Sequence, residues 1–525
     1  MALLAVVVVA AAALRLRVID VPLERDEGEY AYLGQLMLQG SAPFEHAWNM
    51  KLPGTAAAYA LAMAAFGETT RGIRLGLIGV TSATTVLLYL LGRRLFGRAE
   101  GVAAAAAFAT LSLSTETLGI FGHATHFVVL PASAALLVLL SALDSGRLRT
   151  FFASGLLFGV AILMKQPGGA FLAAGVSWIA WSRLRREGRR PGRAAVEAAV
   201  VVASAAVPLL VTVAIIARAG ALDRFRSWVL GYAVDYGTSV PAWVAAGYFT
   251  DAASRIVAQG PLLWALAGAG LALLLAAARG LGDRALVVAL PAFSLAGVSA
   301  GLYFREHYFI LALPGVSLLV AGALWVARRS GGARSRILAP AVASAVVAGC
   351  AHAVYAQGDV FFRMTPVEVS RTIYGLNPFP ESVEIARYLE ANTRPGDGIA
   401  VLGSEPQIYF HAHRRAATGY LYMYPLMERH PLAEAMQEEV IREIERARPA
   451  FLVWVRVRTS WLQSAGSSTR LFGWAANYVP RHYDLAGVVA ILGPDRTEFR
   501  WTAEEIRRGP AAEQDVLVFR RRTID

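Results

Sequence analysis

Residues 25–54 read RDEGEYAYLGQLMLQGSAPFEHAWNMKLPG. This polar stretch carries the ionisable residues Asp26, Glu27, Glu29 and Lys51, and it lies between strongly apolar parts of the chain. Ionisable side chains beside a bilayer are costly, and in membrane proteins they generally mark substrate or ion sites. The stretch is therefore the first candidate for an active site, held in a loop next to membrane-spanning segments.

The composition of the whole chain indicates a polytopic membrane protein. Of its 525 residues, 56% are hydrophobic and 17% are charged, and the mean hydropathy is +0.48, which is too apolar for a soluble protein of this length. The net charge of +12 comes from arginines clustered between apolar runs. Because no basic stripe with interleaved aromatic residues is present, nucleic-acid binding is not expected. The single cysteine, Cys350, cannot form a disulfide within the chain.

Eleven apolar runs are candidates for membrane-spanning helices, since a helix needs about 20 apolar residues to cross a bilayer. They are residues 2–20, 72–91, 100–117, 124–143, 150–165, 167–182, 194–217, 260–278, 285–303, 307–327 and 337–356. The first run is interrupted by Arg15 and Arg17, and a secretory signal peptide is its alternative interpretation, although no basic residues precede it.

Arginine clusters indicate the direction of these spans. The clusters lie at 93–98, 147–149, 183–193, 279–284 and 328–336. All five fall on one side of an eleven-span arrangement, and basic loops of this kind stay in the cytoplasm. We therefore expect a multi-pass protein of the inner (plasma) membrane, with a transmembrane domain at 1–357. Its first outer loop would be 21–71, and an extracytoplasmic domain would follow at 358–525.

The chain after Gly358 has the composition of a water-facing α/β domain. Residues 381–392 and 431–446 show helical periodicity, whereas 399–403 and 451–457 are short apolar strand candidates. The sequence of this part contains no glycine-rich phosphate loop and no Cys/His cluster with metal-ligand spacing. No independent catalytic chemistry is therefore expected there.

Asp26 has two interpretations. Asp26, Glu29 and Tyr30 are three and four residues apart, so they would share one side of a helix. Asp26 could be the N-cap of that helix with Glu29 completing a capping box, and the pattern alone favours this role. The isolated Lys51 could be a snorkelling anchor. Its presence in the same loop nevertheless favours a catalytic role for Asp26 over the cap role. A carboxylate that accepts a proton and a cation that holds a phosphate are what sugar transfer from a lipid phosphate requires.

At this point the chain resembles the membrane glycosyltransferases of family 39, the protein O-mannosyltransferase and lipid A aminoarabinose transferase type, which have the GT-C fold. The resemblance covers most of the membrane region, and its motifs share their order, spacing and expected outer-side location. The motifs are Arg25–Tyr32, Gly40, Pro43, Asn49–Gly54, Arg71–Leu75, Lys165–Pro167, Arg305–Tyr308 and Pro314.

The resemblance implies an inverting transfer of a sugar from a polyprenyl-phosphate donor to an acceptor hydroxyl on the outer face. Asp26 would be the general base, and Lys51 would hold the donor phosphate. Further substrate contacts would come from Glu27, Lys165, Arg305 and His307. For Lys165 and Arg305 a plain cation at the membrane boundary is an equal alternative. The acceptor, whether a glycan, a lipid or a protein, stays open.

The second outer loop departs from the family pattern. Where many relatives carry an acidic residue, residues 122–127 read GHATHF. Glu116 and His126 are the candidates for a second acid or acceptor contact. His123 and His126 are spaced to share a metal, but two histidines without a third ligand are weak evidence. We therefore assign no metal ligand and no certain cofactor, and a divalent metal remains open.

The alternative function is a lipid or glycolipid transporter or flippase. Transporters commonly show internal repeats and charges at the membrane midplane. This sequence shows no convincing repeat, and its candidate residues gather on one side of the membrane. A non-catalytic assembly or adhesion protein would leave Asp26 and Lys51 unexplained, so an enzyme that works among membrane lipids is the favoured interpretation.

Overall fold

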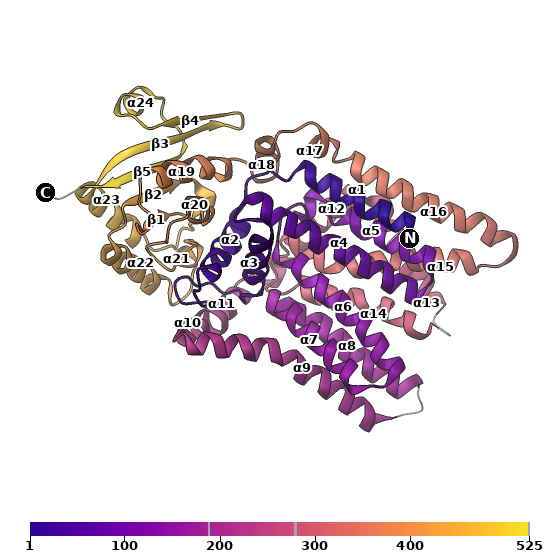
Figure 1. Cartoon of the computed structure of the whole chain (residues 1–525). Helices are drawn as coiled ribbons and strands as arrows, with labels where there is room; N and C mark the ends of the chain where they lie inside the picture. The colour runs from indigo at the N-terminus through magenta and orange to yellow at the C-terminus, as the bar shows by residue number, and fades with distance from the viewer. Residues whose placement is uncertain (187–189, 278–280, 523–525) are drawn as a thin grey trace.

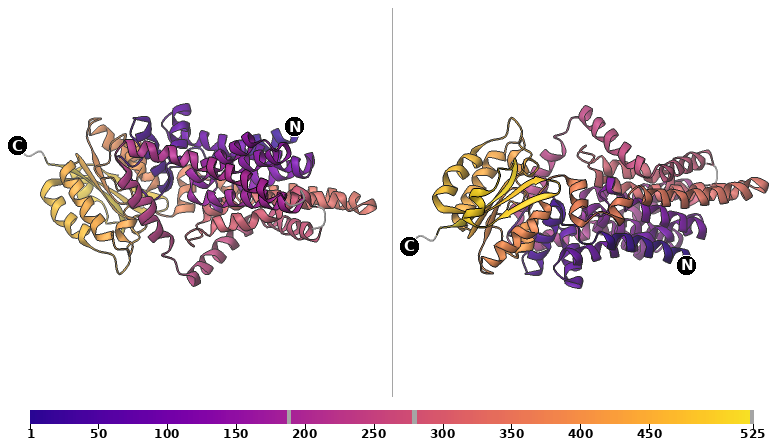
Figure 2. Two further views of the ribbon diagram at one scale, coloured as in Figure 1. Left: turned by 90° about the horizontal axis from the view of Figure 1, so that it is seen from below. Right: turned by 90° about the horizontal axis from the view of Figure 1, so that it is seen from above.

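The computed structural model describes residues 1–186, 190–277 and 281–522. A long helical bundle occupies one end of the molecule and a smaller α/β part with a five-stranded sheet occupies the other (Figure 1). Figure 2 shows the same two parts end to end from below and from above. The N-terminus lies on the bundle.

Each of the eleven predicted apolar runs falls on a helix. The helices are α1 (Ala2–Arg17), α4 (Thr70–Leu95), α5 (Arg98–Leu111), α6 (Ala124–Ser145), α7 (Leu148–Met164), α8 (Gly169–Trp181), α9 (Pro191–Arg218), α13 (Pro261–Ala276), α14 (Ala285–Val298), α15 (Leu313–Arg329) and α16 (Gly332–Tyr355). Within the described residues, five stretches are long and apolar enough to cross a membrane unaided: α4, α6, α9, α16 and the continuous stretch Glu306–Arg329.

One helix of the bundle was not expected from the sequence. Helix α12 (Ala242–Gln259) precedes α13, and the two together would make a sixth span that is bent by 106°. Gly260 and Pro261 stand at the bend, where a proline cannot continue the hydrogen-bond ladder of the preceding helix. The amphipathic α12 lacked the continuous apolar run used to mark a span.

The basic loops gather at one end of the bundle. The C-terminal ends of α8, α13 and α15 and the N-terminal ends of α9, α14 and α16 all lie at the end of the bundle that points away from the sheet (Figure 1). They carry three of the five arginine clusters, of which Arg189 and Arg279 lie outside the described residues. This placement agrees with the prediction that the arginine clusters lie on one side of the membrane.

The α/β part is built on one mixed sheet. Its strands are β1 (Ile399–Leu402), β2 (Phe451–Arg456), β3 (Tyr483–Gly493), β4 (Arg496–Arg500) and β5 (Gln514–Arg521), in the spatial order β1-β2-β5-β3-β4. Among these strands, β1 and β2 pair in parallel and the other neighbours pair antiparallel. The accompanying helices include α18 (Pro366–Tyr374), α19 (Phe379–Ala391), α20 (Gln407–Ala412), α22 (Ala433–Ala447) and α23 (Arg470–His482). The predicted helices and strands fall on α19, α22, β1 and β2.

The first loop folds into two short helices that join the two parts of the molecule. Helix α2 (Arg25–Leu38) packs on α3 (Gly54–Phe66) and also on α20. At the contact with α20, a Cβ on Gly28 would lie 2.6 Å from the backbone nitrogen of Gln407, so only glycine allows this approach. The ring of Tyr32 lies 5.3 Å from that of Tyr409. The loop and the α/β part therefore share one apolar core.

Candidate functional site

Helix α2 begins with a capping box made by Glu24 and Glu27. The Glu24 carboxylate accepts hydrogen bonds from the backbone N–H groups of Asp26 (3.0 Å) and Glu27 (2.8 Å). The Glu27 carboxylate accepts one from the backbone N–H of Glu24 at 3.4 Å. The predicted cap formed by Asp26 and Glu29 is therefore wrong, because the box lies two residues earlier. The side chain of Asp26 is left available for another role.

Lys51 links the two remaining carboxylates of the loop. Its Nζ donates to Asp26 Oδ1 at 2.8 Å and to Glu29 Oε2 at 2.5 Å. The rings of Tyr30 and Tyr422 lie beneath it, with centroids at 4.7 and 5.2 Å. Only 18% of the side chain is exposed, so Lys51 is not a snorkelling anchor. Burial acts to lower the pKa of Lys51, but the two carboxylates outweigh it and raise the pKa well above its usual value.

Asp26 is surrounded by groups that favour its ionised form. Its Oδ1 accepts hydrogen bonds from Lys51 and from the hydroxyl of Tyr422 (2.9 Å), and His123 Nδ1 lies 3.7 Å from its Oδ2. Burial acts to raise the pKa of Asp26, yet Lys51 and His123 prevail and hold that pKa well below its usual range. Asp26 is therefore a carboxylate at neutral pH, and about a quarter of its side chain (26%) is exposed.

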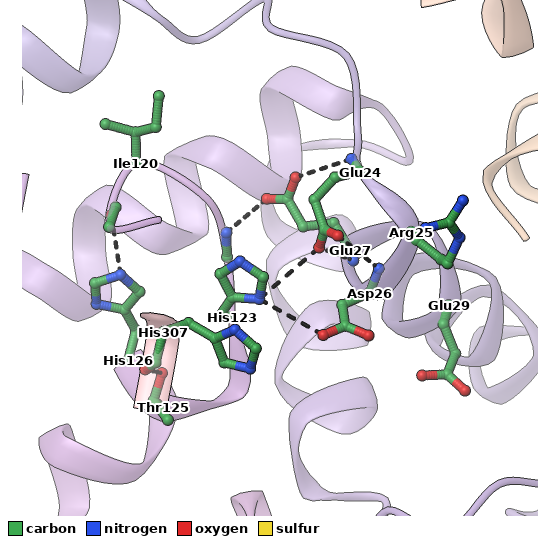
Figure 3. A network of polar contacts seen from close by, with 12 residues as sticks. Glu24, Arg25, Asp26, Glu27, Glu29, Ile120, His123, Thr125, His126 and His307 are labelled. Atoms are coloured by element: carbon green, nitrogen blue, oxygen red, sulfur yellow. Dashed lines mark hydrogen bonds and ion pairs between the residues drawn. The ribbon is translucent and has the colours of Figure 1, made fainter. Parts of the chain in front are cut away.

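Two histidines complete the cluster. His123 precedes α6 and His307 lies on the short helix η6 (Glu306–Ala312), and their rings stack with centroids 4.1 Å apart and 8° between planes. Figure 3 shows a contact from His123 to Asp26, with the ring of His307 beside that of His123. Ligand atoms of the three residues all lie within 4.8 Å of one another. Both ring nitrogens of His123 are buried and make no hydrogen bond to the described residues.

Glu24 is the second carboxylate near His123. Its oxygen lies 3.9 Å from His123 Nδ1. Burial raises the pKa of Glu24 to about 7. His123 acts to lower this pKa, whereas the charges of Asp26 and Glu27 raise it further. This carboxyl group therefore changes its charge near neutral pH beside a carboxylate that stays ionised.

The Glu27 side chain is buried in the scaffold behind the site and does not face its opening. Arg74 forms an ion pair with it at 2.7 Å, and the backbone N–H of Gly122 donates to it at 2.6 Å. The Glu27 side chain has no exposed surface. The substrate contact that the resemblance implied for Glu27 is therefore not supported, because every part of its carboxylate is enclosed by protein.

Lys165 and Arg305 lie on the bundle side of the site. Lys165 follows α7, and its Nζ stands 3.8 Å from the ring centroid of Tyr308. It makes no ion pair with a carboxylate of the described residues, whereas Lys51 makes two. Burial lowers the pKa of Lys165 to about 7. Arg305 is exposed, with its guanidinium 5.5 Å from the ring of Tyr303.

Glu116 and His126 do not join the cluster. Glu116 lies in the short helix η1 (Thr115–Thr117) and pairs with Arg255 at 3.8 Å. His126 is fully buried, and its Nε2 contacts the carbonyl of Gly119 at 2.9 Å. Neither makes a contact with Asp26 in the part of the chain that the structure describes. The spacing of His123 and His126, which was weak evidence for a shared metal, does not bring them together, since His123 faces His307 instead.

Tyr422 was missed by the sequence analysis. It belongs to the α/β part, 396 residues after Asp26. Its surroundings, Gly419-Tyr420-Leu421-Tyr422-Met423-Tyr424, are rich in tyrosine, but tyrosines in an outer domain have no spacing that connects them to a distant loop. Only the fold reveals the contact.

Comparisons with known proteins concern the family and the fold of the chain. The family model of dolichyl-phosphate-mannose-protein mannosyltransferases matches residues 49–212. No curated protein sequence matches the chain. The solved structure of ArnT from Cupriavidus metallidurans bound to undecaprenyl phosphate is similar, with 16% identity and a TM-score of 0.60, covering 98% of this chain and 97% of that one.

An archaeal enzyme has a similar fold. The Archaeoglobus fulgidus oligosaccharyltransferase in complex with Zn and sulfate shares 14% identity at a TM-score of 0.55, covering 94% of this chain and 73% of that one. The AglB structure from the same organism, with an inhibitory peptide and a dolichol-phosphate, shares 13% at a TM-score of 0.51, covering 95% and 74%. These likenesses confirm the predicted fold class: a GT-C fold with a small C-terminal α/β domain.

Proposed function

We propose that the protein is a membrane glycosyltransferase that moves a sugar from a polyprenyl-phosphate donor to an acceptor hydroxyl. The observation that carries the proposal is the ionised, partly exposed Asp26, held by Lys51 beside two histidines where the first loop meets the α/β domain. The mannosyltransferase family match and the likeness to ArnT bound to undecaprenyl phosphate support it. We place the site at the outer face of the inner membrane, with the α/β domain extracytoplasmic.

The proposed reaction is a single displacement with inversion. The acceptor oxygen forms a bond to the anomeric carbon while the bond from that carbon to the phosphate oxygen breaks, and polyprenyl phosphate leaves. As the new bond forms, the acceptor hydroxyl becomes strongly acidic, so even a carboxylate of low pKa can take its proton. Asp26 is assigned this role of general base.

The ion pairs of Lys51 change the assignment of the phosphate contact. Lys51 is already neutralised by Asp26 and Glu29, so its charge serves mainly to hold the base. Lys165 has no carboxylate partner among the described residues, and Arg305 is exposed nearby in the sequence motif that contains His307. We therefore propose Lys165 and Arg305 as the main contacts to the donor phosphate, which needs uncompensated positive charge.

Lys165 gives a pH-dependent prediction. We expect Lys165→Ala to weaken the binding of undecaprenyl phosphate by about 10-fold or more at pH 6, since hydrogen bonds to charged groups contribute roughly 1.5–3 kcal/mol. With a pKa of about 7, Lys165 is a cation below that pH and loses its charge above it. Affinity of the unaltered protein should therefore fall as the pH rises beyond 7.

The matched control is Lys165→Arg, because a guanidinium keeps its charge through this range. Native mass spectrometry or calorimetry with undecaprenyl phosphate across pH 6 to 9 should show the decline in the unaltered protein and its absence in Lys165→Arg. The phosphate itself titrates equally in both proteins. Parallel curves for the two proteins would reject the assignment.

The Asp26, His123 and His307 cluster also fits a divalent cation. A carboxylate and two imidazoles are a common set of three protein ligands for zinc, and the free ring nitrogens of His123 leave it able to bind one. A related archaeal structure contains Zn. We infer that these residues can hold such a cation while no acceptor is bound, because a carboxylate bound to the cation could not at the same time take the acceptor's proton.

The metal proposal predicts binding of about one equivalent of Zn²⁺ in calorimetric titrations with zinc chloride. His307→Ala should remove this binding, because it removes one of three ligands. His46→Ala is the control, since His46 is a half-exposed histidine of the same loop. Unchanged Zn²⁺ affinity in His307→Ala would show that the cluster is not a metal site.

The function as a whole is tested by mass spectrometry of glycolipids and glycoproteins from a deletion strain. We expect one glycosylated product to disappear and its unmodified acceptor to accumulate. Purified protein in liposomes should also convert the matching polyprenyl-phosphate sugar to polyprenyl phosphate. A lipid transporter would move the donor between leaflets without cleaving it, and that result would favour the alternative function.

A further inference from the structure

The α/β domain binds the beginning of α2 through Arg25. Arg25 donates through Nη2 to Glu405 at 2.8 Å and through Nε to the carbonyl of Ser404 at 2.5 Å. Glu405 is fully buried, and the rings of Phe379 and Tyr424 flank the guanidinium at 5.3 Å each. The residue next to the proposed base is therefore anchored in the other domain.

Tyr422 of the same domain contacts the reactive side chains, Asp26 and Lys51, directly. Its hydroxyl lies 2.9 Å from Asp26 Oδ1 and 3.1 Å from the carbonyl of Arg25. Its ring lies 5.2 Å from Lys51 Nζ, which also faces the ring of Tyr30. A cation held against two aromatic faces is attracted electrostatically to both.

The two oxygens of Asp26 consequently differ. Oδ1 accepts from both Lys51 and Tyr422, whereas Oδ2 has no hydrogen bond from a side chain of the described residues and faces His123 at 3.7 Å. A hydroxyl and an ammonium that converge on one oxygen fix the rotation of the carboxylate. The other oxygen is then left to receive the acceptor.

We propose that Tyr422 is a positioning residue through which the docked α/β domain orients Asp26 and Lys51, leaving Asp26 Oδ2 as the oxygen that meets the acceptor. The inference rests on the proposed function. It gives the α/β domain a part in the active site, although the sequence predicts no independent catalytic chemistry there. Holding a reacting group within a narrow range of geometries is a large source of rate.

The test is Tyr422→Phe, which removes the hydroxyl and keeps the ring over Lys51. We expect the turnover rate of sugar transfer to fall about 10- to 50-fold while undecaprenyl phosphate binds with unchanged affinity. Tyr424→Phe is the control, because it removes a hydroxyl from the same segment whose partner is the distant carbonyl of Thr459. Transfer by Tyr422→Phe at the rate of the control would overturn the proposal.

A second measurement separates this inference from the proposed function. Hydrogen–deuterium exchange of the peptide 24–32 reports the docking of α2 whether or not transfer is detected. Tyr422→Ala should accelerate exchange there, whereas Tyr424→Phe should leave it unchanged. Failure of the unaltered protein to use any polyprenyl-phosphate sugar would defeat the proposed function alone. Unchanged exchange in Tyr422→Ala would defeat the positioning role alone.

Discussion

Asp26→Asn should lower the rate of sugar transfer by about 10²- to 10⁴-fold, the usual contribution of a general base. The amide has the shape of the carboxylate and can still accept from Lys51 and Tyr422, but it cannot take a proton from the acceptor. The helix start should survive, because Glu24 rather than Asp26 caps α2. Lys51 also keeps Glu29 as a partner.

The control for this variant lies just before the same loop. Asp20 forms an exposed ion pair with Arg71 at 2.6 Å, and Asp20→Asn should leave both transfer and stability almost unchanged. The rates are to be compared per mole of folded protein in detergent. Asp26→Asn activity within about threefold of the Asp20→Asn activity would exclude Asp26 as the base. A cap role would instead have predicted a loss of about 0.5–2 kcal/mol in stability with turnover preserved.

Much of the architecture could be predicted because it depends on patterns that are local in the sequence. Apolar runs mark helices since the hydrocarbon layer requires them, and arginine clusters mark one side. The nearness of Asp26 and Lys51 could also be inferred, since one polar loop carries both. The helix α12 was missed because its apolar residues cover only one face.

The capping register could not be resolved from residue types. Glu24 and Glu27 have the same three-residue spacing as Asp26 and Glu29, but aspartate is a preferred N-cap residue and glutamate is not, so residue types favoured the wrong pair. Extended backbone angles at Glu24, with φ −80° and ψ 178°, decide between them. This choice depends on how the preceding span enters the loop, and no local residue preference determines that.

The remaining members of the site come from distant parts of the chain. His123, His307 and Tyr422 reach Asp26 through the packing of η6 and the docking of the α/β domain. Three-residue spacing suggested only that His123 and His126 could share one helix face. His123 precedes the helix, however, and its ring turns towards His307. Thus a histidine occupies the place where an acidic residue was sought.

The buried ion pair of Glu27 and Arg74 leads to the largest expected effect on stability. Glu27→Ala should destabilise the protein by about 3–5 kcal/mol, since removing one partner leaves an uncompensated buried charge. The Arg74 side chain is only 4% exposed and donates to both oxygens of Glu27. Thermal unfolding of the purified protein in detergent measures the loss, and the exposed Arg71→Ala variant should show little change.

A double variant and a conservative variant distinguish this structural role from the substrate contact first expected of Glu27. Combining Glu27→Leu with Arg74→Met removes both charges, so it should recover part of the stability lost in Glu27→Ala. Recovery should be incomplete, because the backbone N–H of Gly122 loses its acceptor, which costs about 1–3 kcal/mol. A substrate contact would behave differently: Glu27→Gln would then weaken substrate binding while the thermal midpoint stayed the same. A lower midpoint with unchanged undecaprenyl phosphate affinity in Glu27→Gln would place Glu27 in the scaffold that holds Asp26.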